Sequence, residues 1–278
     1  MTLETLHRLE AIVRAAGPIV REYHDLPNDI TWKGANDPVT AADHAVNEFL
    51  VAELRRAFPG DAILAEESQD DLSRLDKERV WCVDPLDGTK EFIARNGEFS
   101  IMVGLAVQGV AVLGVVYQPI LDLMYSGLRQ GGAWRIEGGQ RRPLQVSAID
   151  RPADLALVVS RSHRNPITDA IKAAIGISRE RISGSVGLKC GLIARQEADL
   201  YLHPAPGVKE WDTCAPEAIL CGAGGKISDC WGRPLRYNQP DVRRRGGLVA
   251  SNGHCHSRII TLMAPVLAAA GIDPDQGW

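Results

Sequence analysis

The sequence predicts two differently built halves, an α+β half followed by an α/β half. In the first half, two helical patterns precede a series of short, mostly antiparallel strands. In the second half, helical and strand patterns alternate. The hydrophobic content of 45% in 278 residues supports a substantial core, as in globular proteins. The composition changes near residue 148, so we divide the chain into halves 1–148 and 149–278, which we expect to pack as one unit.

Two amphipathic helices are predicted to open the first half. Apolar residues recur at steps of three and four along residues 6–23, which predicts one helix with a buried face. Pro27 and Asn28 are expected to break it. The second helix is predicted to begin near Thr40 and to end before the Pro59–Gly60 pair.

Short strands are predicted to fill the rest of the first half. Residues 99–117 are apolar and rich in valine, with Gln108 and Gly109 in the middle, which predicts a hairpin. Residues 73–78 are polar and predict a loop, and residues 137–140 predict a turn. The other predicted strands are residues 62–65, 80–83, 122–126 and 132–136.

The second half is predicted to alternate strands with helices. The predicted strands are residues 155–159, 198–202, 226–229 and 247–250. The predicted helices are residues 166–175, 186–196, 215–221 and 257–270. The glycine-rich run 222–225 is a typical helix end. This alternation is typical of an α/β unit.

The most informative segment is the Asp-Pro-Leu-Asp-Gly-Thr run at residues 84–89, directly after an apolar strand. Asp84 and Asp87 offer hard oxygen ligands, which suit Mg²⁺. The proline between them leaves the carbonyl of Leu86 available as a third oxygen ligand. Gly88 and the amide after it, at a helix N-terminus, suit a phosphate. The alternative is an Asx-type turn followed by a helix cap.

Residues 84–89 resemble the signature of the inositol monophosphatase superfamily, which comprises Mg²⁺-dependent, lithium-sensitive phosphatases. The continuation Lys-Glu-Phe at 90–92 resembles the branch that acts on 3'(2'),5'-bisphosphate nucleotides. The similarity extends over several blocks between about residues 37 and 252. The resemblance implies a layered αβαβα sandwich of the inositol monophosphatase and fructose-1,6-bisphosphatase type, with the active site between the halves.

The resemblance also implies a metal centre of two Mg²⁺ ions, with a third, weaker one as an option. One ion is expected on Glu66, Asp84 and the carbonyl of Leu86. The second is expected on Asp84, Asp87 and Asp212, so that Asp84 bridges the two. A solvated acidic loop is the alternative for Glu66, and a simple helix cap is the alternative for Asp212.

Three residues are expected to act on the attacking water, again by resemblance. Thr89 would hydrogen-bond this water, and Asp43 or Glu66 would help to position it. Asp43 would also line the third metal position. Its alternative is an acidic residue in the first turn of a helix, where the helix dipole favours it.

The substrate contacts are implied by two further blocks, residues 160–163 and 185–189. In the first block, His163 and Arg161 could donate to a second phosphate or to the ribose. For each of the two blocks, the alternative is a helix-capping or surface role. The second block has Ser-Val-Gly at 185–187 where many close relatives have Gly-Ser-Ser, which weakens any inference about base recognition. The expected substrate-binding set is Asp87, Gly88, Thr89, His163, Ser185, Lys189 and Asp212.

The resemblance implies a phosphatase that removes the 3'-phosphate of adenosine 3',5'-bisphosphate, or of its sulfated relative, to give AMP from the former. An inositol or sugar monophosphatase is the alternative within the same class. A non-catalytic regulatory binding protein on the same scaffold is the alternative from a different class. The complete set of acidic residues argues against the last of these.

The composition and net charge limit the kinds of partner that we expect this protein to bind. The net charge of −4 argues against a nucleic-acid polymer. No apolar stretch is long enough to span a membrane, and no signal peptide precedes the first helix, so a cytoplasmic protein is expected. The six cysteines are scattered, which is typical of reduced thiols. The arginines at 243–245 predict a solvated loop, with a substrate contact as the alternative. A homodimer is expected only by family analogy.

Overall fold

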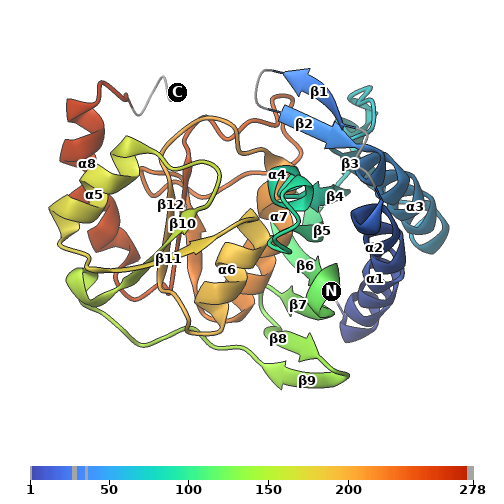
Figure 1. Cartoon of the computed structure of the whole chain (residues 1–278), viewed down its shortest axis with the longest axis horizontal. Helices are drawn as coiled ribbons and strands as arrows, with labels where there is room; N and C mark the ends of the chain where they lie inside the picture. The colour runs from blue at the N-terminus through green and yellow to red at the C-terminus, as the bar shows by residue number, and fades with distance from the viewer. Residues whose placement is uncertain (1, 27–29, 35–36, 274–278) are drawn as a thin grey trace.

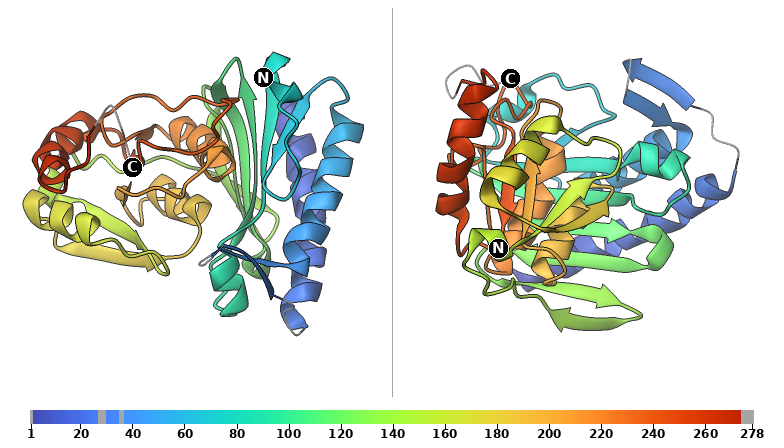
Figure 2. Two further views of the ribbon diagram at one scale, coloured as in Figure 1. Left: turned by 90° about the horizontal axis from the view of Figure 1, so that it is seen from above. Right: turned by 60° about the vertical axis from the view of Figure 1, so that its left-hand side comes forward.

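The computed structural model describes residues 2–26, 30–34 and 37–273, which form five layers of helices and sheets. A first helical layer covers a large sheet, a second helical layer lies between this sheet and a smaller one, and a third covers the outer face (Figures 1 and 2). The buried apolar side chains of these layers form three clusters. The predicted αβαβα sandwich is therefore confirmed.

The N-terminal part of the first half differs from the sequence prediction at two points. The single helix predicted over residues 6–23 is two helices, α1 (Leu3–Ala15) and α2 (Gly17–Asp25), followed by α3 (Ala41–Ala57). Pro18 lies in the first turn of α2, where its missing N–H interrupts the hydrogen-bond ladder of a continuous helix. A small hairpin, β1 (Ile30–Gly34) and β2 (Asp37–Thr40), was not predicted. The predicted break at Pro27 and Asn28 lies outside the described residues.

The large sheet has seven strands in sequence order, β3-β4-β5-β6-β7-β8-β9. Only the β3–β4 pair within this sheet is parallel. The predicted hairpin and its turn at Gln108 and Gly109 are confirmed, whereas β9 was not predicted. The strands are β3 (Ala62–Ala65), β4 (Arg79–Asp87), β5 (Ser100–Val107), β6 (Val110–Gln118), β7 (Leu123–Leu128), β8 (Gly132–Glu137) and β9 (Gln140–Pro143). The predicted loop 73–78 contains the short helix η1 (Ser73–Asp76), and η2 (Pro119–Leu121) follows β6.

The middle layer consists of α6 (Val186–Ala194) and α7 (Glu210–Gly222). Helix α7 lies directly on the large sheet because glycines face it. A Cβ atom on Gly114 would lie 2.4 Å from the carbonyl oxygen of Ala215, and one on Gly104 would lie 2.5 Å from the Ala215 nitrogen. Helix α7 begins earlier than the predicted start at residue 215, so Asp212 lies in its first turn.

The smaller sheet has the strand order β11-β10-β12-β14-β13, with α5 and α8 on its outer face. Strand β10 is parallel to both neighbours, as the α/β pattern predicts, and β14 is antiparallel to both of its neighbours. Edge strand β11 was not predicted, because most of its side chains are charged or exposed. The elements are η3 (Pro152–Asp154), β10 (Ala156–Ser160), α5 (Pro166–Ile175), β11 (Arg179–Ser183), β12 (Leu200–His203), β13 (Lys226–Ser228), β14 (Leu248–Ser251) and α8 (His256–Ala269).

Two further expectations concern the arginine run and the thiols. Arg243 and Arg245 pair with Asp241 at the surface. Arg244, however, is buried and donates to the hydroxyl of Thr213 from two of its nitrogens.

The six cysteines are free thiols. None of the helices in the described ranges could span a membrane.

Candidate active site

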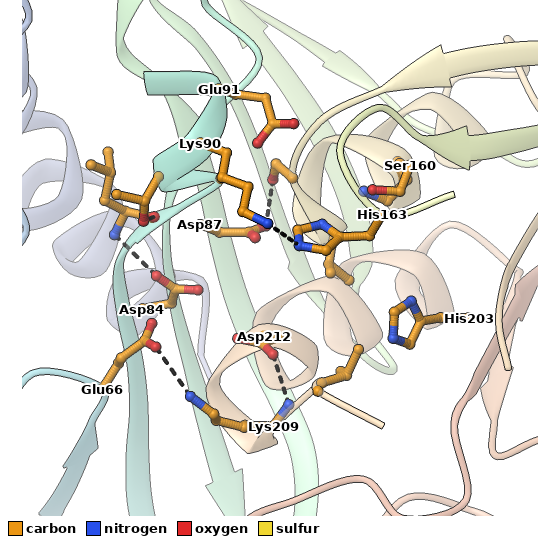
Figure 3. A pocket seen from close by; sticks show the side chains of 18 of the residues that line it. Glu66, Asp84, Asp87, Lys90, Glu91, Ser160, His163, His203, Lys209 and Asp212 are labelled. Carbon is orange, nitrogen blue, oxygen red and sulfur yellow. Dashed lines mark hydrogen bonds and ion pairs between the residues drawn. The ribbon is translucent and has the colours of Figure 1, made fainter. Parts of the chain in front are cut away.

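Three carboxylates from distant parts of the chain meet between the halves. Glu66 directly follows β3, Asp84 lies in β4, and Asp212 lies in the first turn of α7 (Figure 3). The parallel register pairs Ala65 with Val83, which makes the two residues that follow neighbours. One oxygen from each of the three carboxylates lies within 4.8 Å of the others.

The electrostatics of this cluster favour a bound cation. Burial raises the pKa of Asp84 well above its usual range, and the charges of Glu66, Asp87 and Asp212 raise it further. Burial also raises the pKa of Asp212 well above its usual range, with Glu66 and Asp87 adding repulsion. Buried carboxylates at this spacing destabilise one another unless a cation compensates them. The donors are hard oxygens, so the residues fit Mg²⁺ or a similar divalent ion.

Lys209 connects two members of the cluster. Its backbone N–H donates to Asp212 Oδ2 at 2.7 Å, and its ammonium lies 3.3 Å from Glu66 Oε1. Lys209 is therefore the N-cap of α7, and Asp212 is the third residue of the helix rather than the cap. The first helical turn holds this carboxylate at the positive end of the helix dipole.

The remaining two predicted metal-binding residues lie beside this group. Leu86 donates its N–H to Asp84 Oδ1 at 3.0 Å. The hydroxyl of Thr89 approaches the carbonyl oxygen of Leu86 at 3.3 Å. Asp87 is not part of the group of three carboxylates found among the described residues. Its Oδ2 instead accepts hydrogen bonds from Ser185 Oγ at 2.5 Å and from the N–H of Gly187 at 3.2 Å.

Asp43 reaches this region from α3. Its Oδ2 accepts from the N–H and the hydroxyl of Thr40, at 2.8 and 2.6 Å, which caps the helix. Its Oδ1 accepts from the hydroxyl of Thr89 at 3.2 Å. Burial raises the pKa of Asp43. The alternative, an acidic residue in the first turn of a helix, and the contact with Thr89 thus both describe this side chain.

A cavity of about 420 Å³ opens over the carboxylates, between the two halves. All of the predicted site residues except Asp43 line this cavity, and Asp43 accepts a hydrogen bond from Thr89, which does line it. The predicted residues in its wall are Glu66, Asp84, Leu86, Asp87, Gly88, Thr89, His163, Ser185, Lys189 and Asp212.

Cationic and aromatic groups form the other side of this cavity. Lys90 Nζ lies 3.1 Å from His163 Nε2, and burial, followed by the charge of Lys90, lowers the pKa of His163 (Figure 3). The ammonium of Lys189 is buried and lies 5.0 Å from the ring centre of Tyr201. Arg161 does not line the cavity but forms two hydrogen bonds with Glu98, at 2.7 and 2.6 Å.

The contribution of β12 and of the loop after it to the site was not predicted from the sequence. Tyr201, His203 and the segment 206–208 line the cavity. Burial lowers the pKa of His203 to about 4, so its ring is neutral at pH 7. Strands β10 and β12 are parallel and end at Ser160 and His203, both of which line the cavity. Ligands of parallel sheets bind beyond the carboxyl ends of the strands. The alternation of strands and helices in the sequence could therefore have indicated that residues at the end of β12 line a site.

Known proteins provide an independent comparison. The sequence model of the inositol monophosphatase family matches residues 3–267. The chain belongs to the inositol monophosphatase family. The 3'(2'),5'-bisphosphate nucleotidase CysQ of Escherichia coli (strain K12) is 38% identical over 229 residues, which cover 81% of this chain and 91% of the relative.

Solved structures of this family have the same fold. CysQ from Bacteroides thetaiotaomicron has a TM-score of 0.76 at 30% identity, with 89% of this chain and 97% of that chain covered. An inositol monophosphatase from Anabaena (Nostoc) sp. PCC 7120 has a TM-score of 0.77 at 29% identity, with 97% of this chain and 100% of that chain covered. The family resemblance of the sequence is therefore confirmed, and the chain is a phosphoric monoester hydrolase of this family.

Proposed function

We propose that this chain is a Mg²⁺-dependent phosphatase that removes the 3'-phosphate from adenosine 3',5'-bisphosphate, giving AMP and phosphate. The observation that carries this proposal is the 38% identity to the E. coli nucleotidase over 91% of that relative. The cavity supports it, because an acidic cluster and a group of cationic side chains line the same space. The sulfated relative presents the same 3'-phosphate and is a second candidate substrate.

The acidic residues are proposed to hold two Mg²⁺ ions. Glu66, Asp84 and Asp212 are the central ligands, and Asp87 and the carbonyl of Leu86 complete the set. When bound, Mg²⁺ lowers the pKa of a water molecule and stabilises the negative charge of the phosphate and of the departing oxygen. The carboxylates in turn keep the site close to neutral, so that an anionic substrate can enter.

Thr89 is proposed to orient the attacking water. The single hydroxyl proton of Thr89 is directed to Asp43 Oδ1 or to the carbonyl of Leu86, at 3.2 and 3.3 Å. The lone pairs of this hydroxyl are then free to accept a hydrogen bond from the attacking water. Asp43 is held in place by Thr40, so the hydroxyl of Thr89 has a defined direction. The water therefore directs an oxygen lone pair away from Thr89 and toward the phosphorus.

The cationic side of the cavity is proposed to bind the second phosphate. Lys90 and Lys189 supply positive charge, and His163 adds a ring nitrogen. Because His163 Nε2 lies 3.1 Å from the ammonium of Lys90, this nitrogen acts as the acceptor and Nδ1 carries the proton. Charge-assisted hydrogen bonds from these groups would distinguish a bisphosphate from a monophosphate.

Replacement of Thr89 tests the orientation of water. Thr89→Ala is expected to lower kcat roughly 100-fold, in the range of lost acid–base assistance, with little change in the substrate KM. Thr89→Ser keeps the hydroxyl and is expected to restore most of the rate. Steady-state kinetics at saturating Mg²⁺ measures both variants. A Thr89→Ser enzyme as slow as Thr89→Ala would contradict this role.

The substrate is tested by phosphate release with Mg²⁺ from three compounds in parallel. Adenosine 3',5'-bisphosphate is expected to react far faster than inositol 1-phosphate or fructose 1,6-bisphosphate. Dominant hydrolysis of inositol 1-phosphate would instead favour the alternative that the Anabaena structure represents. No hydrolysis of any of them, together with no Mg²⁺ binding, would favour the non-catalytic binding protein.

A further inference from the structure

Ser185 has an unusual backbone conformation for a residue in the wall of the active site. Its φ is +49° and its ψ is 134°, at the N-cap of α6. Among the described non-glycine residues with positive φ, Ser185 alone lines the cavity. A side chain in this region of φ costs free energy, so the conformation persists only where surrounding contacts compensate for it.

The hydroxyl of Ser185 supplies these contacts. It donates its proton to Asp87 Oδ2 at 2.5 Å. It lies 2.8 Å from the hydroxyl of Ser100, which must then be the donor, and it accepts from the N–H of Leu188 at 3.2 Å. One donated and two accepted hydrogen bonds use the full capacity of a hydroxyl group. Ser185 therefore has no proton left to offer a substrate.

The contact with Asp87 joins the two halves of the chain. Asp87 is the last residue of β4 in the large sheet, and Ser185 begins α6 in the second half. The N–H of Gly187 donates to the same oxygen, Oδ2, at 3.2 Å. Two donors on one oxygen fix the orientation of the carboxylate, which leaves Oδ1 as the oxygen that Asp87 can present to a cation.

We propose that Ser185 is a positioning residue that orients Asp87 as a ligand of the second Mg²⁺. This inference rests on the proposed metal-dependent function. It replaces the direct substrate contact expected from the sequence with an indirect role through Asp87. It also explains why a serine stands at a position where glycine would avoid the strain: only the serine supplies the hydroxyl.

Two variants separate the effect of losing the Ser185 hydroxyl from the effect of relieving the backbone strain. Ser185→Ala removes the hydroxyl and keeps the strained φ, whereas Ser185→Gly removes both. Gln108→Gly is the matched control, because Gln108 also has a φ of +49° but lies in the β5–β6 turn, outside the cavity. Each protein is titrated with Mg²⁺ alone by isothermal titration calorimetry, and its melting temperature is measured with a chelator.

Both Ser185 variants are expected to bind Mg²⁺ at least about tenfold more weakly at one site, as is typical when the partner of a metal ligand is lost. Gln108→Gly is expected to bind Mg²⁺ like the wild type. Without metal, Ser185→Gly is expected to melt at a higher temperature than Ser185→Ala, because glycine relieves the strain.

Unchanged Mg²⁺ affinity in Ser185→Gly would overturn the inference and leave Ser185 as a helix cap. A raised substrate KM at saturating Mg²⁺, with normal Mg²⁺ affinity, would overturn it in favour of a direct substrate contact. In both cases the wild type still binds Mg²⁺ and hydrolyses its substrate, so the proposed function stands. A wild type that binds no Mg²⁺ would contradict the proposed function as well.

Discussion

Asp84→Asn is expected to lower phosphatase turnover by about 100- to 1,000-fold while making the metal-free protein more stable at neutral pH. The amide side chain of the variant would keep an oxygen to accept the hydrogen bond that Leu86 N–H now donates to Asp84 Oδ1. The substitution removes the charge that the cation requires and that Glu66, Asp87 and Asp212 repel. The loss of activity and the gain in stability thus have the same cause.

The sign of the pH dependence follows from the raised pKa of Asp84. In the folded protein this carboxyl binds a proton more tightly than in the unfolded chain, where its pKa is about 3.9. Stability therefore falls as the pH rises from that value through the raised pKa. The stabilising effect of Asp84→Asn should be small near pH 4 and largest at pH 8. Thermal melts with a chelator at both pH values measure it.

Asp229→Asn is the matched control for this experiment. Asp229 is also buried, but its oxygens accept hydrogen bonds from the N–H groups of Trp231 and Arg233 and from the Arg233 guanidinium. We expect the Asp229→Asn protein to be less stable than the wild type and to have unchanged turnover, which is the reverse of the result expected for Asp84→Asn. An Asp84→Asn protein that keeps its activity, or that melts below the wild type at pH 8, would contradict the metal assignment.

The sequence predicted the features of this site that are local. Residues 84–89 form one strand end and one helix start, so their residue types and spacing favoured oxygen ligands, with an Asx-type turn as the alternative. Glu66 was predicted through the family resemblance, and the structure explains its approach to Asp84 by two adjacent parallel strands. Asp212 was predicted only through the family resemblance, because no periodicity shows which face of the sheet α7 covers.

Other features depend on contacts that a one-dimensional pattern does not contain. The hydrogen bond between Ser185 and Asp87 joins residues 98 positions apart. The family resemblance implied that both residues belong to the site, but nothing in the sequence indicated that they contact each other. His203 lies just beyond the predicted strand 198–202, and only the pairing of β12 beside β10 shows that it lines the cavity. The break between α1 and α2 was different in kind, because Pro18 marks it in the sequence.

Gly114→Ala is expected to destabilise the protein and to weaken its cation binding together. The new Cβ atom would lie 2.4 Å from the carbonyl oxygen and 2.6 Å from the Cα atom of Ala215. These are helix backbone atoms and cannot rotate away, so α7 must move off the sheet. Overpacking of this kind typically costs about 1–3 kcal/mol, and an overlap with backbone atoms lies at the upper end of that range. Asp212 lies one turn before Ala215, so the same movement shifts a carboxylate of the cluster.

Thermal melts and Mg²⁺ titrations of Gly114→Ala test both effects. Gly60→Ala is the control, because a Cβ atom on Gly60 would meet no other atom within 4 Å. The control is expected to keep its Mg²⁺ affinity and to be as stable as the wild type, or slightly more stable. If Gly114→Ala melted at a lower temperature but bound Mg²⁺ normally, the close packing of α7 on the sheet would contribute to stability but not to cation binding. Parallel losses would mean that the close approach of α7 to the sheet at Gly114 also determines where the third carboxylate lies.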